Sequence, residues 1–204
     1  MSRLLIDLKF WRRFVVASPQ SSFDFLLGRL PINNNRLFSD ACTSYGMGGV
    51  VLLDITNNPS AVVEGFFWQL SWEEWDKVVK MSDLSPGSVK INQAEFLAAL
   101  ITCETFARFC SGRYTFLTLD NFSAKAWIDM ARCPIFPFDR CAQGTHLFLL
   151  EQSIKIKTRW IPSAENVTAD IFSRKFFPSK RRHRVADKWF RKVKPRWINT
   201  LKFL

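Results

Sequence analysis

The sequence predicts an α/β fold in which helices pack on a mixed five-stranded sheet. Two observations predict this fold. Runs of β-branched and aromatic residues that end at turn-forming residues indicate strands, and apolar residues at helical spacing indicate helices. In chain order they give three strands, a helix, a strand, two helices, a strand and a last helix. A meander followed by β-α-β units of this kind builds one sheet with helices packed on it.

The individual elements follow from local patterns. The first three strands are expected at residues 36–40, 50–54 and 61–70. A capping box then opens a short helix, because Ser71 and Glu74 have the spacing of the N-cap and N3 positions. Further strands are expected at 114–119 and 154–161, and further helices at 92–109, 123–130, 141–152 and 166–174.

Length and composition suit one domain with extensions, since the chain has 204 residues of which 48% are hydrophobic. We expect an amphipathic helix and linker in residues 1–35, the domain in 36–175 and a basic tail in 176–204. No apolar run reaches the roughly 18 residues that cross a bilayer, and the N-terminus lacks the features of a signal peptide. We therefore expect an intracellular protein of the cytoplasm or nucleus, without a membrane partner.

The positive charge is concentrated at the C-terminal end. Residues 174–204 hold 12 basic residues and one acid, which gives the whole net charge of +11, and residues 1–173 are neutral. Such a tail suggests a polyanionic partner, usually nucleic acid. A solubilising tail and a nuclear import signal are alternatives. The aromatic residues Trp189, Phe190 and Trp197 alternate with basic ones there, as in strips that stack on bases, or they could begin a further domain.

Cysteine and histidine give no sign of a zinc site. The five cysteines include no CxxC pair, and His146 and His183 lie far apart. We expect reduced thiols in the core. Trp68, Trp72 and Trp75 could contact a nucleic acid, but a core position is the stronger expectation because tryptophan buries a large apolar area.

Four acidic residues occupy the ends of predicted elements. Asp40 ends the first strand, Glu95 lies in the first turn of the long helix, Asp120 follows the fourth strand, and Asp170 lies in the first turns of the last helix. Strand ends and helix starts can converge on one edge of a sheet, where four carboxylates would suit Mg²⁺ or Mn²⁺. Each acid also has a structural explanation, as a helix cap, a turn residue or a partner of a helix dipole.

The sequences around these acids narrow the alternatives. They are FSDA at 38–41, INQAEFLAA at 91–99, LTLDN at 117–121, and WIP followed by NVTADIFSR at 160–174. In these motifs and in their order, residues 36–175 resemble the ribonuclease H family, in particular the domains of retroelement reverse transcriptases. The DLKFW segment at 7–11, the Ile-Asn pair at 91–92 and the Asp-Asn pair at 120–121 are most similar to DIRS-type retrotransposons.

The resemblance implies a ribonuclease H-like fold and hydrolysis of the RNA strand of RNA–DNA hybrids with two Mg²⁺ or Mn²⁺ ions. It implies that Asp40 bridges the ions, that Glu95 and Asp120 support one ion, and that Asp170 supports the other. The partners implied are a hybrid and a reverse transcriptase polypeptide. No polymerase motif precedes residue 36, so we expect a fragment or stand-alone descendant of a polyprotein.

Two further residues are candidates for contact with the substrate, Asn121 and Arg174. For Arg174, a surface position on the helix is an equal alternative. Many members of the family also carry a histidine in a mobile loop before the last Asp. Here the loop at 163–165 is short and has none, and His146 falls in a predicted helix, so turnover could be reduced.

Two other functions compete with a ribonuclease H. Integrases and transposases share the fold class, but their acids usually run Asp, Asp, Glu, whereas here Glu95 is second and Asp170 is last. A catalytically inactive domain, kept for nucleic-acid binding or for packing in a reverse transcriptase, is the second alternative. Inactive copies usually lose acids, and all four are present here.

Overall fold

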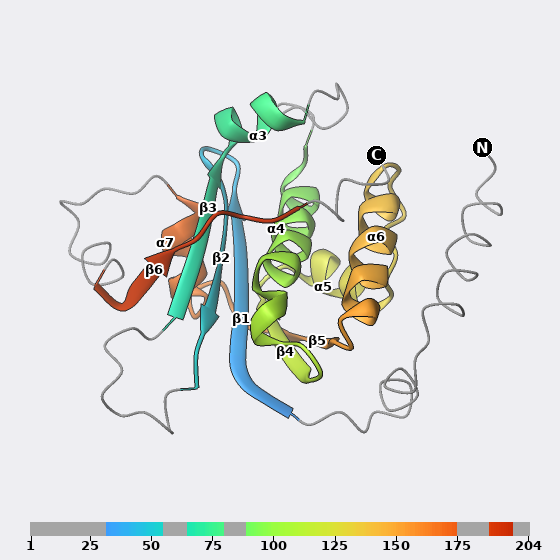
Figure 1. The fold of residues 1–204 in the computed structure, drawn as a ribbon. Helices are drawn as coiled ribbons and strands as arrows, with labels where there is room; N and C mark the ends of the chain where they lie inside the picture. Colours follow the sequence, from blue (N-terminus) through green and yellow to red (C-terminus); the bar gives the residue numbers. More distant parts are fainter. Residues whose placement is uncertain (1–31, 55–64, 80–88, 175–187, 198–204) are drawn as a thin grey trace.

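The structure is a computed structural model that describes residues 32–54, 65–79, 89–174 and 188–197. Figure 1 shows a central sheet with helices on both faces. The helix and linker expected in the first part of the chain lie outside the described residues, apart from 32–35. No helix in the described ranges is long and apolar enough to cross a membrane.

The sheet has six strands in the order β5-β4-β1-β2-β3-β6. The strands are β1 (Ile32–Cys42), β2 (Gly46–Leu52), β3 (Gly65–Ser71), β4 (Tyr114–Leu119), β5 (Lys155–Trp160) and β6 (Phe190–Lys192). The first three form the expected antiparallel meander, and β4 and β5 run parallel to β1 on its other side. The sheet is therefore mixed, as predicted.

The expectation of five strands is wrong, because β6 is a sixth. It lies within the segment expected to be a basic tail, and it pairs with β3 in parallel, with Phe190 opposite Gly65. The pairing continues where the amide of Val193 donates to the carbonyl of Phe67 (2.8 Å). A three-residue strand rich in Lys and Arg carries no alternating apolar pattern, so sequence periodicity could not reveal it.

Several strand boundaries differ from those expected. β1 begins at Ile32, because the Asn-rich segment expected to be linker is tied to the end of β2. Asn34 Nδ2 donates to the carboxylate of Asp54 (2.7 Å), and Asn35 Oδ1 accepts from the amide of Asp54 (2.8 Å). The Gly-rich part of the expected turn belongs to β2 instead, and only residues 43–45 form the turn.

Helices cover the sheet on both faces, as Figure 1 shows with α7 on one side and α4, α5 and α6 on the other. The helices are α3 (Trp72–Val78), α4 (Ile91–Phe106, followed by a short 3-10 turn at Ala107–Phe109), α5 (Phe122–Asp129), α6 (Phe138–Glu151) and α7 (Val167–Ser173). The expected capping box opens α3, because Ser71 Oγ accepts from the amide of Glu74 (3.2 Å) and the Glu74 carboxylate accepts from the amide of Ser71 (2.9 Å).

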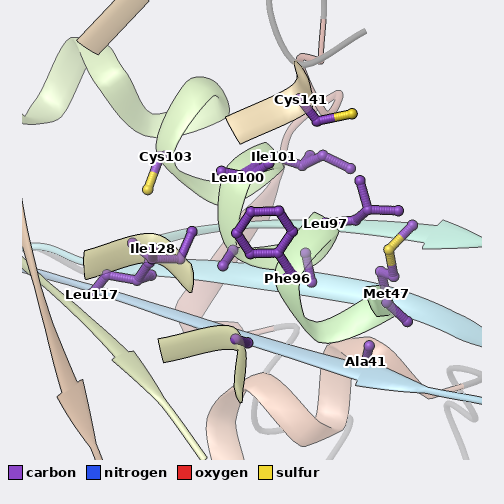
Figure 2. Packing of buried hydrophobic residues seen from close by; sticks show 14 of the residues in the cluster. Ala41, Met47, Phe96, Leu97, Leu100, Ile101, Cys103, Leu117, Ile128 and Cys141 are labelled. Atoms are coloured by element: carbon purple, nitrogen blue, oxygen red, sulfur yellow. The ribbon is translucent and has the colours of Figure 1, made fainter. Parts of the chain in front are cut away.

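The main core forms around α4. Every residue from Gln93 to Phe106 is buried, since the helix packs on β1 and β2 and also contacts α5 and α6. Figure 2 shows α4 side chains such as Phe96 and Ile101 among Met47, Leu117 and Ile128. Trp68, Trp72 and Trp75 are buried in this core, and all five cysteines are buried free thiols, as expected.

A smaller core lies on the opposite face, under α7. The Phe172 ring stacks on that of Phe67 with centroids 4.0 Å apart, and Val50 completes the buried cluster. Phe190 of β6 packs against it. The segment after β6 then reaches the main core, where Trp197 packs edge-on against Trp75 with centroids 6.3 Å apart.

Candidate metal centre

Three of the four expected acids meet at one edge of the sheet. One carboxylate oxygen from each of Asp40, Glu95 and Asp120 lies within 4.8 Å of the other two. β1 and β4 are parallel neighbours, so the acids at their carboxyl ends lie on the same edge, and the first turns of α4 bring Glu95 to it. This buried acidic cluster could hold a metal ion.

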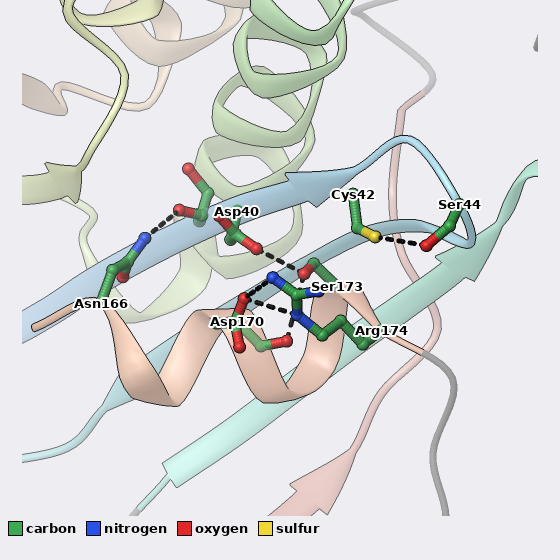
Figure 3. A network of polar contacts seen from close by, with 8 residues as sticks. Asp40, Cys42, Ser44, Asn166, Asp170, Ser173 and Arg174 are labelled. Atoms are coloured by element: carbon green, nitrogen blue, oxygen red, sulfur yellow. Dashed lines mark hydrogen bonds and ion pairs between the residues drawn. The ribbon is translucent and has the colours of Figure 1, made fainter. Parts of the chain in front are cut away.

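Asp40 is the member of the acidic cluster that α7 contacts. It lies near the end of β1, is 5% exposed, and accepts a hydrogen bond from Ser173 Oγ of α7 (Figure 3). Burial raises the pKa of Asp40 to about 7, with the Ser173 hydrogen bond opposing that rise and the charges of Asp120 and Asp170 adding to it. A carboxylate with this environment gains much from a nearby cation.

Glu95 is compensated less, because a backbone hydrogen bond from Ala41 is the only contact that lowers its pKa. Its side chain is 5% exposed, and Glu95 Oε2 is buried without a hydrogen-bond partner. Burial, together with the nearby charges of Asp40 and Asp120, raises the pKa of Glu95 to about 10. A buried polar oxygen without a partner is costly, and a cation in the cluster would satisfy it.

The donor set fits a hard divalent ion. All three donors are carboxylate oxygens, which Mg²⁺ and Mn²⁺ prefer, and the cluster contains no cysteine or histidine. Repulsion among closely spaced acids raises their pKa values unless a cation neutralises them. The unpartnered oxygen of Glu95 is therefore an observation in favour of an ion at this place.

Asp170 lies apart from this group of three, although its charge reaches Asp40. Its carboxylate forms an ion pair with Arg174 one turn further along the chain, at 2.5 Å from Nη2 and 2.6 Å from Nε (Figure 3). Both side chains are partly exposed. The partner of Arg174 in this structure is therefore the carboxylate of Asp170. The expected contact of Arg174 with substrate stays a prediction.

Asn121 has a structural role in the described contacts. Its Oδ1 caps α5 by accepting from the amide of Ala124 (2.9 Å), and its Nδ2 donates to Asn92 Oδ1 (2.8 Å). The second contact links the start of α4 to the end of β4, next to Glu95 and Asp120. The residue therefore positions the elements that carry two acids, and its expected contact with substrate also stays a prediction.

Three residues that sequence reasoning did not select help to place α7. Ser173 holds Asp40, and Asn166 Nδ2 donates to the carbonyl of Ser39 (3.0 Å), the residue before Asp40 (Figure 3). Gly48 lies opposite Asp40 in the β1–β2 register, and a Cβ there would lie 2.4 Å from the backbone carbon of Phe172. The sequence motif at 166–174 contains Asn166 and Ser173, so this motif could have identified both residues as part of the site.

His146 is not part of the acidic cluster. It lies in α6, where its Nε2 is buried without a partner among the described residues. Burial lowers the pKa of His146 to about 4, so the side chain is neutral near pH 7. The structure thus supports the expectation of a position within the helix.

Comparison with models of known protein families finds none that matches this chain, and comparison with curated proteins finds no relative. The geometry of the acidic cluster and the motifs around it are therefore the basis for a functional proposal.

Proposed function

We propose that this chain is a ribonuclease H, a two-metal-dependent endonuclease that hydrolyses the RNA strand of RNA–DNA hybrids, as part or descendant of a retroelement reverse transcriptase. The observation that carries the proposal is the group of Asp40, Glu95 and Asp120 oxygens within 4.8 Å of one another. The motif order in the sequence and the α/β fold with a mixed sheet support it.

The residues have distinct tasks in this proposal. Asp40, Glu95 and Asp120 would hold the ions, and Asp170, whose charge acts on Asp40, would support them. When bound, Mg²⁺ or Mn²⁺ would lower the pKa of an attacking water and offset charge on the scissile phosphate. Ser173 orients Asp40, and Arg174 orients Asp170. Preference for a hybrid would come from groove shape and contacts to the 2′-hydroxyl.

A cleavage assay tests this function. The full chain is incubated with a labelled hybrid, a DNA duplex or single-stranded RNA, each with Mg²⁺, with Mn²⁺ or with EDTA. We expect cutting of the RNA strand in the hybrid alone, and only with metal. Asp40→Asn should abolish it, whereas Asp76→Asn, at an exposed acid of α3, should not. Full activity in Asp40→Asn, or cutting in EDTA, would contradict the proposal.

The second candidate is an inactive ribonuclease H-like domain that binds nucleic acid or packs within a reverse transcriptase. The ion pair between Asp170 and Arg174 favours it, because a neutralised fourth acid is a weaker metal ligand. The same assay separates the two functions. Hybrid binding without cutting, unchanged by Asp40→Asn, would favour the inactive domain.

A further inference from the structure

One part of the sheet on the α7 side is left open by the described helices. α7 packs on β1, β2 and β3, and β4 and β5 lie beyond it. The strand register gives the residues of this open part. Tyr114 pairs with Lys155, Phe116 with Lys157, and Thr118 with Arg159, while Phe116 also pairs with Arg36 of β1. We define the β4–β5 face as Arg36, Tyr114, Phe116, Lys155, Lys157 and Arg159.

The neighbouring residues show which way this face points. Leu117 is fully buried in the main core, so Phe116 before it points to the opposite side. Thr158 Oγ1 donates to Asp129 of α5 (2.6 Å), so Lys157 and Arg159 also point away from α5. The Tyr114 and Phe116 rings meet edge-on, with centroids 5.6 Å apart, which places them on one side.

The face combines cations with aromatic rings. Arg36, Lys157 and Arg159 are exposed, and the structure shows no acidic partner for them among its described residues. Tyr114 and Phe116 are half-buried between the basic residues of β1 and those of β5. Alternate residues of a strand lie about 6.6 Å apart, so β5 carries a row of positive charge along its length.

The basic residues of β5 run along the sheet toward the acidic cluster. Arg159 lies beside Thr118, and Thr118 is two residues before Asp120 in β4. Thr118 also pairs with Phe38, which is two residues before Asp40 in β1. A polyanion whose phosphate lay at the acidic cluster could therefore continue over β4 and β5 past α7. An exposed basic row beside half-buried aromatic rings fits a nucleic-acid strand, whose phosphates and bases or sugars match the two kinds of side chain.

We infer that the β4–β5 face binds one strand of the nucleic-acid substrate beyond the scissile phosphate, an inference that rests on the proposed function. Arg36, Lys157 and Arg159 contact phosphates, and Tyr114 and Phe116 contact sugars or bases. This surface extends the substrate site from the metal-binding edge onto the sheet, beside the strands on which α7 mainly packs.

Binding as a function of salt concentration tests the inference. The full chain with Asp40→Asn, which should not cut, is titrated with a labelled hybrid over a range of KCl concentrations. Adding Lys157→Gln and Arg159→Gln should weaken binding by about tenfold near physiological salt. It should also lower the slope of log affinity against log salt by about 2, because each lost phosphate contact removes about 0.9. Lys77→Gln, at an exposed lysine of α3, is the control and should change neither quantity.

A second measurement does not depend on those variants. Hybrids that carry 4-thiouridine in the RNA strand or 4-thiothymidine in the DNA strand are irradiated on the bound chain, and crosslinked peptides are mapped. Crosslinks in 114–118 or 155–159 support the inference. An unchanged salt slope in the double variant, or crosslinks confined to other segments such as 188–197, overturns it and indicates that this face binds another part of the chain or an acidic protein. The proposed function fails separately, if the wild-type chain neither cuts nor binds a hybrid.

Discussion

Ser173 donates a hydrogen bond to Asp40 across the contact between α7 and β1. This contact lowers the pKa of Asp40 against the effect of burial, so the carboxyl group of Asp40 ionises more easily than it would without Ser173. The last helix therefore acts on Asp40 through the Ser173 hydroxyl group as well as through the charge of Asp170.

We expect Ser173→Ala to move the metal dependence of cutting. Without the hydroxyl, the pKa of Asp40 rises, and protons compete better with the metal ion. The Mg²⁺ concentration for half-maximal cutting should increase several-fold near pH 7, and the difference should shrink as pH rises. Titration of Mg²⁺ at several pH values measures this, with Ser163→Ala in the exposed loop as control. An equal loss at every pH would indicate a structural role only.

The stability of the metal-free protein should fall as pH rises. The folded pKa of Asp40 is raised from 3.8 to about 7, and that of Glu95 from 4.5 to about 10. Their contribution is fully present below the unfolded values and is lost as pH rises through the folded ones. His146 has the opposite effect below pH 6.5, because its folded pKa is lowered to about 4.

Thermal unfolding in EDTA between pH 6.5 and 9 measures this dependence. The melting temperature should decline over that window, and Mg²⁺ should reverse the decline. Asp40→Asn should flatten it and raise the stability of the metal-free protein at pH 8, because it removes a repelled buried charge. A melting temperature that rises with pH in EDTA would be inconsistent with protonated carboxylates in the cluster.

Gly48→Ala should displace α7 from the sheet. Its Cβ would lie 2.4 Å from the carbonyl carbon and 2.5 Å from the carbonyl oxygen of Phe172, and backbone atoms cannot rotate away. We expect a loss of about 1–3 kcal/mol in stability, as for other overpacked sites, and a larger loss of cutting. Gly112→Ala is the control for lost stability alone: a Cβ there meets no atom within 4 Å, but φ of +65° strains the backbone, so stability should fall while cutting is kept. Normal cutting by Gly48→Ala would show that the distance between α7 and the sheet does not affect activity.

Phe190→Ala should weaken the packing of α7 on the sheet. The Phe190 ring lies edge-on to that of Phe172, with centroids 5.7 Å apart. For a half-buried ring we expect a loss of about 1–3 kcal/mol, below that of a fully buried Phe, with a higher requirement for Mg²⁺. Lys188→Ala, at an exposed residue two positions earlier, serves as control. Unchanged unfolding and Mg²⁺ dependence would mean that β6 does not support the helix.

The sequence predicted the elements whose pattern is local. β4 was predicted at the same residues, and α4 was predicted within a few residues, because alternation and helical spacing are visible in a short window. The meeting of Asp40, Glu95 and Asp120 was also predicted, since their motifs mark strand ends and a helix start.

What escaped prediction depends on contacts between distant residues. β6 forms only because β3 offers an open edge and the smaller core accepts Phe190. The Asn-rich start of β1 depends on Asp54, about twenty residues away. The ion pair of Asp170 with Arg174 could have been predicted, because the two residues are four apart in a helix. Whether Arg174 contacts Asp170 or a substrate depends on the three-dimensional site.

The pairing of β6 with β3 also has a consequence for association between copies of this chain. β3 reads GFFWQLS, a segment with aromatic residues, no charge and no proline, which is the composition of strands that aggregate when their edge is free. β6 covers the first three residues of that edge and places Arg191 and Lys192 along it. Like charges on neighbouring molecules repel, so a second copy could not easily add a strand there. A chain that ends before residue 188 would leave this edge of β3 uncovered. We would expect such a chain to give insoluble protein during expression.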